Sequence, residues 1–228
     1  MSRRCGDGAP GAAAYRGARL PAGGTPWLMA RFCAVDLELS GLDPRRDEIL
    51  SFGAVPIEEG RVALGAAIEG LVRPAGEISE SSIRVHGLRA ADLQHAPPLD
   101  EALDPLLASI AGAVPVVHAA AVERAFLTPA LRRRGLRLRR PMVDTAVLGL
   151  VWLHERDGRA PRHITLADLV DELGLPSHRP HDAVGDALTT AQAFIALATK
   201  LDALSPESVR SLTRAGRRLQ AMQTFAAP

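Results

Sequence analysis

The sequence predicts an α/β fold in which a mixed five-stranded sheet carries helices on both faces. Short apolar runs bounded by turn residues fill residues 31–72, which is typical of consecutive antiparallel strands. Helical periodicity then alternates with short apolar runs, an order that indicates a mixed sheet. The composition is 47% hydrophobic and 23% charged with a formal net charge of +1, which describes a globular chain and indicates no particular partner.

The first 28 residues are rich in Gly, Ala and Pro and show neither strand nor helix periodicity. We therefore expect residues 1–28 to be a disordered tail. No apolar stretch long enough for a signal peptide follows Arg3 and Arg4. Met29 directly precedes the first expected strand and is a candidate start of the protein.

Three strands are expected first, at Phe32 to Leu37, Ile49 to Ile57 and Val62 to Val72, because turn sequences separate these apolar runs. Caps and apolar spacing then predict, in chain order, helices within 88–110, a strand at 114–117, a helix at about 120–133, a short strand at 142–143, and helices at 145–154, 166–173, 182–200 and 206–222.

Neither the cysteines nor the apolar runs indicate export or a membrane. Cys5 and Cys33 lack the spacing of a disulfide or metal motif, so we expect a reducing, cytoplasmic location. No apolar run approaches the roughly 18 residues of a membrane span, so we expect no membrane partner.

Two acidic residues end the first expected strand. Because side chains alternate along a strand, Asp36 and Glu38 point to the same face. Paired carboxylates on an apolar strand are unfavourable unless a cation lies between them, and hard cations such as Mg²⁺ take oxygen ligands. A solvated turn entry is the alternative, and the pair alone does not decide between them.

A second polar group stands at the start of the expected 182–200 helix. His181 and Asp186 are five residues apart and can face one cleft, and Gly185 leaves room for close approach. A metal-ligating carboxylate beside an imidazole is suited to activating water. The alternative is an ordinary helix start, with Asp182 as N-cap and solvated first-turn side chains.

Together these segments resemble the DEDDh 3′-to-5′ exonucleases, the family of the epsilon proofreading subunit of bacterial DNA polymerase III. The residues from Asp36 to Leu42 resemble the first motif of the family, and those from His181 to Asp186 resemble the third. Other matching positions follow in the expected order: Val85-His86-Gly87-Leu88, Pro97-Pro98, His118, Phe126-Leu127 and Val143-Asp144-Thr145. We therefore expect an exonuclease domain at 29–202, between the tail and a C-terminal amphipathic helix at 203–228.

The resemblance implies a ribonuclease-H-like fold and a two-metal site with Mg²⁺ or Mn²⁺, which hydrolyses phosphodiesters at the 3′ end of DNA or RNA and releases nucleoside monophosphates. It implies that Asp36 bridges both ions and that Glu38 and Asp186 hold the ion that carries the attacking water. His181 would accept the proton of that water. The residues implied to surround the terminal nucleotide are Leu39, Ser40, Gly41, His86 and Phe126.

The second motif departs from the family pattern, which reads approximately His-Asn-Ala-x-Phe-Asp. Here Ala119 replaces the asparagine and Glu123 replaces the aspartate. Glu123 keeps the carboxylate on a side chain one methylene longer, which can reach a metal directly or through a water. The resemblance thus implies Glu123 as the fourth metal ligand, in a site that is either reshaped or weakened.

Two further segments concern partners. Six arginines within residues 132–140 form either a phosphate-binding ridge or a solvated face favoured by the helix dipole. Residues 220–225 weakly resemble a peptide that binds sliding clamps, with the polar end of a helix as the alternative. The expected partner is the 3′ end of single-stranded nucleic acid, with a polymerase or clamp as candidates, in DNA replication or repair.

Two other interpretations stay open, a nucleic-acid-binding or regulatory module with a weakened site and an oligoribonuclease-type enzyme. Retention of His181 and of an acid at every ligand position disfavours the first. DNA and RNA are not separated, because both present the same phosphodiester and the contacts to the 2′-hydroxyl are unspecified.

Overall fold

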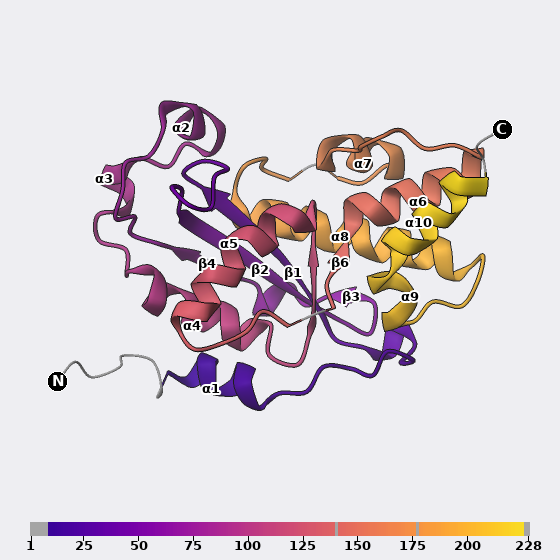
Figure 1. Ribbon diagram of the computed structural model, residues 1–228, viewed down its shortest axis with the longest axis horizontal. Helices are drawn as coiled ribbons and strands as arrows, with labels where there is room; N and C mark the ends of the chain where they lie inside the picture. Colours follow the sequence, from indigo (N-terminus) through magenta and orange to yellow (C-terminus); the bar gives the residue numbers. More distant parts are fainter. Residues whose placement is uncertain (1–8, 140, 177, 226–228) are drawn as a thin grey trace.

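A mixed sheet of six strands forms the centre of the described part of the chain, which comprises residues 9–139, 141–176 and 178–225 of a computed structural model (Figure 1). The order is β3-β2-β1-β5-β6, and β4 also pairs with β2. β1 is antiparallel to β2 and parallel to β5, and β5 is parallel to β6. The strands are β1 (Phe32–Leu39), β2 (Ile49–Glu58), β3 (Arg61–Val62), β4 (Ile68–Leu71), β5 (Val114–Val117) and β6 (Val143–Asp144).

The sheet has one strand more than predicted, because the expected strand at 62–72 is interrupted. β3 pairs with Ile57 and Glu58 of β2, whereas β4 pairs with residues 51–54 of the same strand. The short 3-10 helix Leu64–Ala66 separates the two. Two short strands therefore occupy the place of one, and the predicted mixed α/β architecture is confirmed.

Helices cover both faces of the sheet, as predicted (Figure 1). One layer holds α1 (Pro10–Gly17), α4 (Leu99–Ser109) and α5 (Ala120–Arg133); the other holds α6 (Thr145–Asp157), α8 (Ala183–Asp202), α9 (Val209–Thr213) and α10 (Ala215–Phe225). The connections carry a 3-10 helix at Trp27–Met29, α2 (Glu80–His86), α3 (Ala90–Leu93) and α7 (Leu166–Leu173). None of the helices in the described residues is both long enough and apolar enough to cross a membrane.

Alternate side chains of β1 divide the hydrophobic core in two. Phe32 and Ala34 pack in the core beneath α6 and α8, whereas Cys33 and Val35 pack in the core beneath α4 and α5. Asp36 continues the first series, since side chains alternate along a strand. The polar end of β1 therefore faces α8.

The expectation of a disordered tail over residues 1–28 is wrong where the structure describes it. Residues 1–8 lie outside the described residues, but α1 packs against α4 with Tyr15 only 3% exposed. Asp104 accepts hydrogen bonds from two backbone N–H groups at the start of α1, and Arg139 donates to carbonyls at its end. Composition alone missed this helix because so short a helix depends on tertiary contacts.

The expected C-terminal helix is divided. α9 and α10 are separated at Arg214, so the predicted single helix at 206–222 is wrong in this detail. The segment at 220–225 that resembles a clamp-binding peptide belongs to α10, and Met222 packs against the core beneath α6 and α8. This segment therefore forms the end of a helix, as its alternative interpretation stated.

Candidate active site

The candidate site lies where β1 extends beyond its neighbour β5. β5 pairs with β1 from Phe32 to Ala34, and among the described residues no strand pairs with β1 beyond Ala34 on that side. On the other edge β2 continues, with Asp36 opposite Gly53 and Glu38 opposite Ser51. The two carboxylates therefore extend from a strand that is fixed on one side and open on the other.

A glycine in β2 lets α8 approach the sheet beside Asp36. A Cβ atom at Gly53 would lie 2.1 Å from the carbonyl oxygen of Ala183, the first residue of α8. Real Cβ atoms do not tolerate such a distance, so the docking of α8 requires glycine there. Gly185 has a comparable role, because its Cβ would lie 2.7 Å from the carbonyl oxygen of Arg179. This agrees with the room predicted at Gly185.

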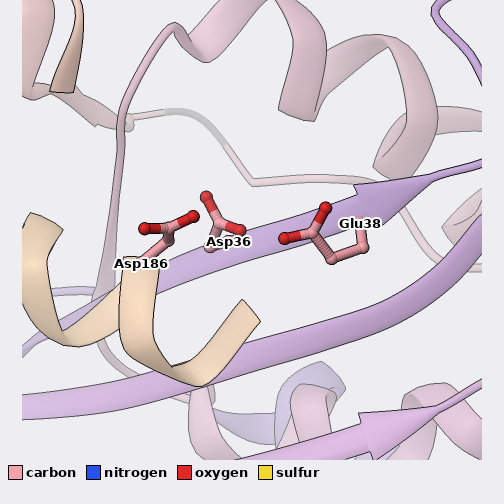
Figure 2. Close-up of side chains that lie close together, drawn as sticks. All are labelled: Asp36, Glu38 and Asp186. Carbon is pink, nitrogen blue, oxygen red and sulfur yellow. The ribbon is translucent and has the colours of Figure 1, made fainter. Parts of the chain in front are cut away.

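Asp36, Glu38 and Asp186 converge where α8 meets β1. One carboxylate oxygen from each lies within 4.8 Å of the other two. Figure 2 shows the two β1 side chains and Asp186 of α8 turned toward a common space. The structure thus brings together three of the carboxylates that the sequence singles out, although about 150 residues separate the two segments.

Glu123 approaches the same region from the first turn of α5. Its side chain is 4% exposed, and within the described residues its Oε2 atom is buried without a hydrogen-bond partner. The negative charge of Glu123 helps to raise the pKa of Asp36, which identifies the two as neighbours. Glu123 does not belong to the compact group of three.

Burial and mutual repulsion favour the protonated forms of these carboxyl groups. Burial, reinforced by Glu123, Asp186 and Glu38, raises the pKa of Asp36 well above its usual value. Burial and Asp186 raise the pKa of Glu38 to about 7, and burial and Glu38 raise that of Glu123 to about 8. Burial also raises the pKa of Asp186, although the backbone and charge of His181 partly oppose this. A cluster of several carboxylate oxygens has the donor chemistry of a divalent cation site.

His181 lies directly beside the cluster. Its backbone N–H donates a 2.9 Å hydrogen bond to Oδ2 of Asp186, while its side chain is exposed. Its φ of 58° is in the left-handed region, which histidine enters more readily than most residues. His181 and Asp186 together line a cavity of about 300 Å³ next to α7. Asp182 is the N-cap of α8, as the alternative interpretation of this segment held.

Three of the residues implied to contact a nucleotide follow Glu38 directly. The side chain of Leu39 packs in the core beneath α4 and α5, away from the carboxylates. The hydroxyl of Ser40 accepts a hydrogen bond from the backbone of Glu48 at 2.9 Å and donates to Asp47 at 3.2 Å. Gly41 lies against the Asp47 carboxylate, which a Cβ atom would meet at 2.4 Å. These contacts close the 40–48 loop, and the backbone N–H and carbonyl of Ser40 are also hydrogen-bonded within the protein.

The other two implied contact residues differ in position. Burial lowers the pKa of His86, the Leu39 backbone partly opposes this, and the charge of His181 lowers it further, so His86 lies near His181. Phe126 is 4% exposed in the core beneath α4 and α5, and its edge lines a cavity of about 460 Å³ beside residues 44–49. The structure thus brings His86 toward the site and gives Phe126 a core position.

Asp144 is a site-building residue whose full role was not predicted. The sequence indicates it as a cap of α6, and it accepts a 3.0 Å hydrogen bond from Ala146 in that role. It also accepts hydrogen bonds from Ala119 at 3.2 Å and Ala120 at 2.8 Å, at the start of α5. One carboxylate therefore fixes two helix starts and, through α5, the position of Glu123. The second contact joins distant segments and leaves no local signal in the sequence.

Comparison with known proteins identifies the class. A family model described as "Exonuclease" matches residues 33–194, so the chain belongs to the exonuclease family and contains its nuclease domain. The nuclease domain of 3'hExo, a DEDDh family member solved with bound rAMP, has the same fold. That structure is 17% identical with a TM-score of 0.60, over 78% of this chain and 95% of that one. The predicted resemblance and the ribonuclease-H-like fold are thereby confirmed.

Curated relatives include replication proteins. The "DNA polymerase III PolC-type" protein of Thermotoga petrophila is 33% identical over 167 residues, which are 73% of this chain and 12% of the relative. The DNA polymerase III subunit epsilon of Aquifex aeolicus is 25% identical over 175 residues, which are 76% of this chain and 83% of the relative. The chain thus spans about an eighth of the length of the PolC-type relatives.

Proposed function

We propose that this protein is a metal-dependent 3′-to-5′ exonuclease that releases nucleoside monophosphates from the 3′ end of DNA or RNA. The observation that carries the proposal is the convergence of Asp36, Glu38 and Asp186 within 4.8 Å in a chain that belongs to the exonuclease family. Hydrolysis of a phosphodiester needs charge stabilisation and an activated water, and such a cluster can organise both with bound cations.

The residues present fit two Mg²⁺ or Mn²⁺ ions. Asp36 lies between Glu38 and Asp186 in Figure 2 and is therefore the residue suited to bridging the ions. Glu38 and Asp186 would hold the ion nearer to the water, and the unpartnered Oε2 of Glu123 would supply a further ligand. When bound, such ions activate water and stabilise the negative charge that develops on the phosphate.

His181 is the proposed general base. Its backbone bond to Asp186 holds the residue beside the cluster, and its exposed imidazole is accessible to a water at the site. A neutral imidazole can accept the proton of the attacking water near neutral pH. His86 and residues 39–41 are proposed to contact the terminal nucleotide, while Phe126 supports α5 from the core.

The relatives support the proposed substrate and partner. Their names associate the curated relatives with DNA polymerase III, and the structural neighbour was solved with bound rAMP, so both nucleic acids are proposed substrates. A polymerase, or the sliding clamp of one, is the proposed protein partner, in the cytoplasm. The phosphodiester chemistry is identical in each case.

The decisive experiment compares wild type with Asp36→Asn on 5′-labelled single-stranded DNA and RNA. We expect a ladder of products shortened from the 3′ end with Mg²⁺ or Mn²⁺, and loss of at least about 100-fold in rate in the variant, because positioning and charge depend on this carboxylate. Glu101→Gln, an exposed acid on α4, is the control and should keep the wild-type rate. Undiminished cleavage in excess EDTA or by Asp36→Asn would contradict the proposal.

A further inference from the structure

The fold divides the arginines of residues 132–140 among different tasks. Arg134 is buried and forms a 3.0 Å ion pair with Asp104. Arg139 donates hydrogen bonds to backbone carbonyls at the end of α1. Arg133 lines the cavity beside residues 44–49, and Arg140 lies outside the described residues. The described arginines of this segment therefore do not share one surface, and Arg132 and Arg137 lie together on another face.

Arg132 and Arg137 line a groove of about 830 Å³ along α5. Arg124 lines the same groove, and among the described residues none of these three side chains has an ion pair. The remaining lining residues are all uncharged: Thr128, Gly135, Leu136 and Leu138. Three arginines without an acid among these lining residues are suited to a polyanion, because one guanidinium group can donate two parallel hydrogen bonds to a phosphate.

The groove lies along the helix that carries Glu123. Arg124 directly follows Glu123 in α5, and Arg124, Thr128 and Arg132 lie on one helix face at a spacing of four residues. Arg132 is therefore about 12 Å further along the helix axis, at a rise of about 1.5 Å per residue. A groove of this length can contact a few phosphates of one strand.

We propose that this arginine groove, formed by Arg124, Arg132 and Arg137, binds the phosphate backbone of the substrate strand a few nucleotides upstream of its 3′ end. The inference rests on the proposed function and specifies how the strand leaves the site. The other basic cavity, at Arg45, Arg46 and Arg133, also contains Asp47 and Glu48, and its mixed charge favours a strand less. Contacts to the backbone position a strand without reading its sequence.

Salt dependence tests the inference. The double variant Arg132→Gln with Arg137→Gln removes two phosphate contacts, so the slope of log K against log salt for a labelled single-stranded 20-mer should fall by about 1.4. Fluorescence anisotropy in EDTA measures this slope without cleavage. In the presence of metal, kcat/KM should fall about tenfold on the 20-mer and much less on a dinucleotide, which has no upstream phosphates to contact.

Arg214→Gln with Arg217→Gln is the matched control, since these exposed arginines lie at α10 in the opposite helical layer. The inference is overturned if the groove variant and the control have equal salt slopes and equal kcat/KM on the 20-mer. If wild type cleaves neither substrate, the proposed function fails, while the anisotropy still tests the groove. If the double glutamine variant unfolds at a lower temperature than wild type, Thr128→Glu is used instead. It places an acid in the groove and must weaken binding of the 20-mer.

Discussion

The two halves of the candidate site are held by different contacts. In the β1 and α8 half, a paired strand and a helix docked over Gly53 hold three carboxylates within 4.8 Å. In the α5 half, Glu123 extends from a helix start whose backbone N–H groups donate to Asp144 and whose N-cap, Ala119, has a left-handed φ of 63°. The sequence matches the family pattern in the β1 and α8 half and departs from it in the α5 half. We therefore expect the β1 and α8 half to be the more sensitive to substitution.

The largest effect is expected from a substitution that displaces α8 from β1 and leaves every carboxylate unchanged. Gly53→Ala places a methyl group where the backbone of Ala183 lies, so α8 must move away from β1 and carry Asp186 with it. Misplacement by about 1 Å costs about 100-fold in rate, and overpacking of this kind destabilises by about 1–3 kcal/mol. Cleavage assays together with urea unfolding measure both effects.

Gly65→Ala is the control, because a Cβ there meets nothing within 4 Å. Its rate and stability should equal those of wild type. A fully active Gly53→Ala would mean that the site does not depend on close docking of α8.

The sequence was enough to predict the carboxylates of the β1 and α8 half, but not the residues that bring them together. Asp36 and Glu38 were accessible because strand alternation is local, and Asp186 was found with its neighbour His181. Gly53 was missed because its role depends on a helix about 130 residues away. For the same reason α1 was expected to be disordered: its ends are held by side chains from α4 and from the segment after α5.

The next prediction tests whether Glu123 of the α5 half binds metal. Glu123→Gln preserves size and removes the charge, so we expect a rate loss of about 10- to 100-fold if its carboxylate binds metal. Glu123→Asp keeps the charge and should retain a comparable or moderately reduced rate. Single-turnover cleavage with Mg²⁺ and with Mn²⁺ measures both variants.

A silent Glu123→Gln together with a faster Glu123→Asp would show that the α5 half has lost its function. That outcome would favour a nucleic-acid-binding module with a weakened site. Both variants keep the N-cap contacts of Asp144, so neither changes the start of α5.

The stability of the metal-free protein should fall as pH rises. Glu38 and Glu123 have pKa values raised to about 7 and about 8 from a usual 4.5, so the folded state binds more protons than the unfolded state between these limits. Unfolding free energy therefore decreases from about pH 5 to about pH 8, and divalent cations should oppose this decrease most strongly at high pH. Melting temperatures in EDTA and in Mn²⁺ at pH 5.5, 7 and 8.5 measure the effect. Glu123→Gln should flatten the EDTA curve, and a wild-type curve that is already flat would contradict the prediction.

The smallest effect is expected from substitutions of Ala119, the N-cap of α5. Alanine is unfavourable in the left-handed region, whereas asparagine enters it more readily, so Ala119→Asn should stabilise the protein by about 0.5–1 kcal/mol. Ala119→Gly removes the same strain but adds freedom to the unfolded chain, so its gain should be smaller. If strain at this residue also loosens Glu123, Ala119→Asn should raise kcat as well as Tm, whereas a purely local strain would change Tm alone. A lower Tm for Ala119→Asn would mean that neighbouring residues fit only the methyl group, so the left-handed φ of Ala119 would not be the weak point of the α5 half.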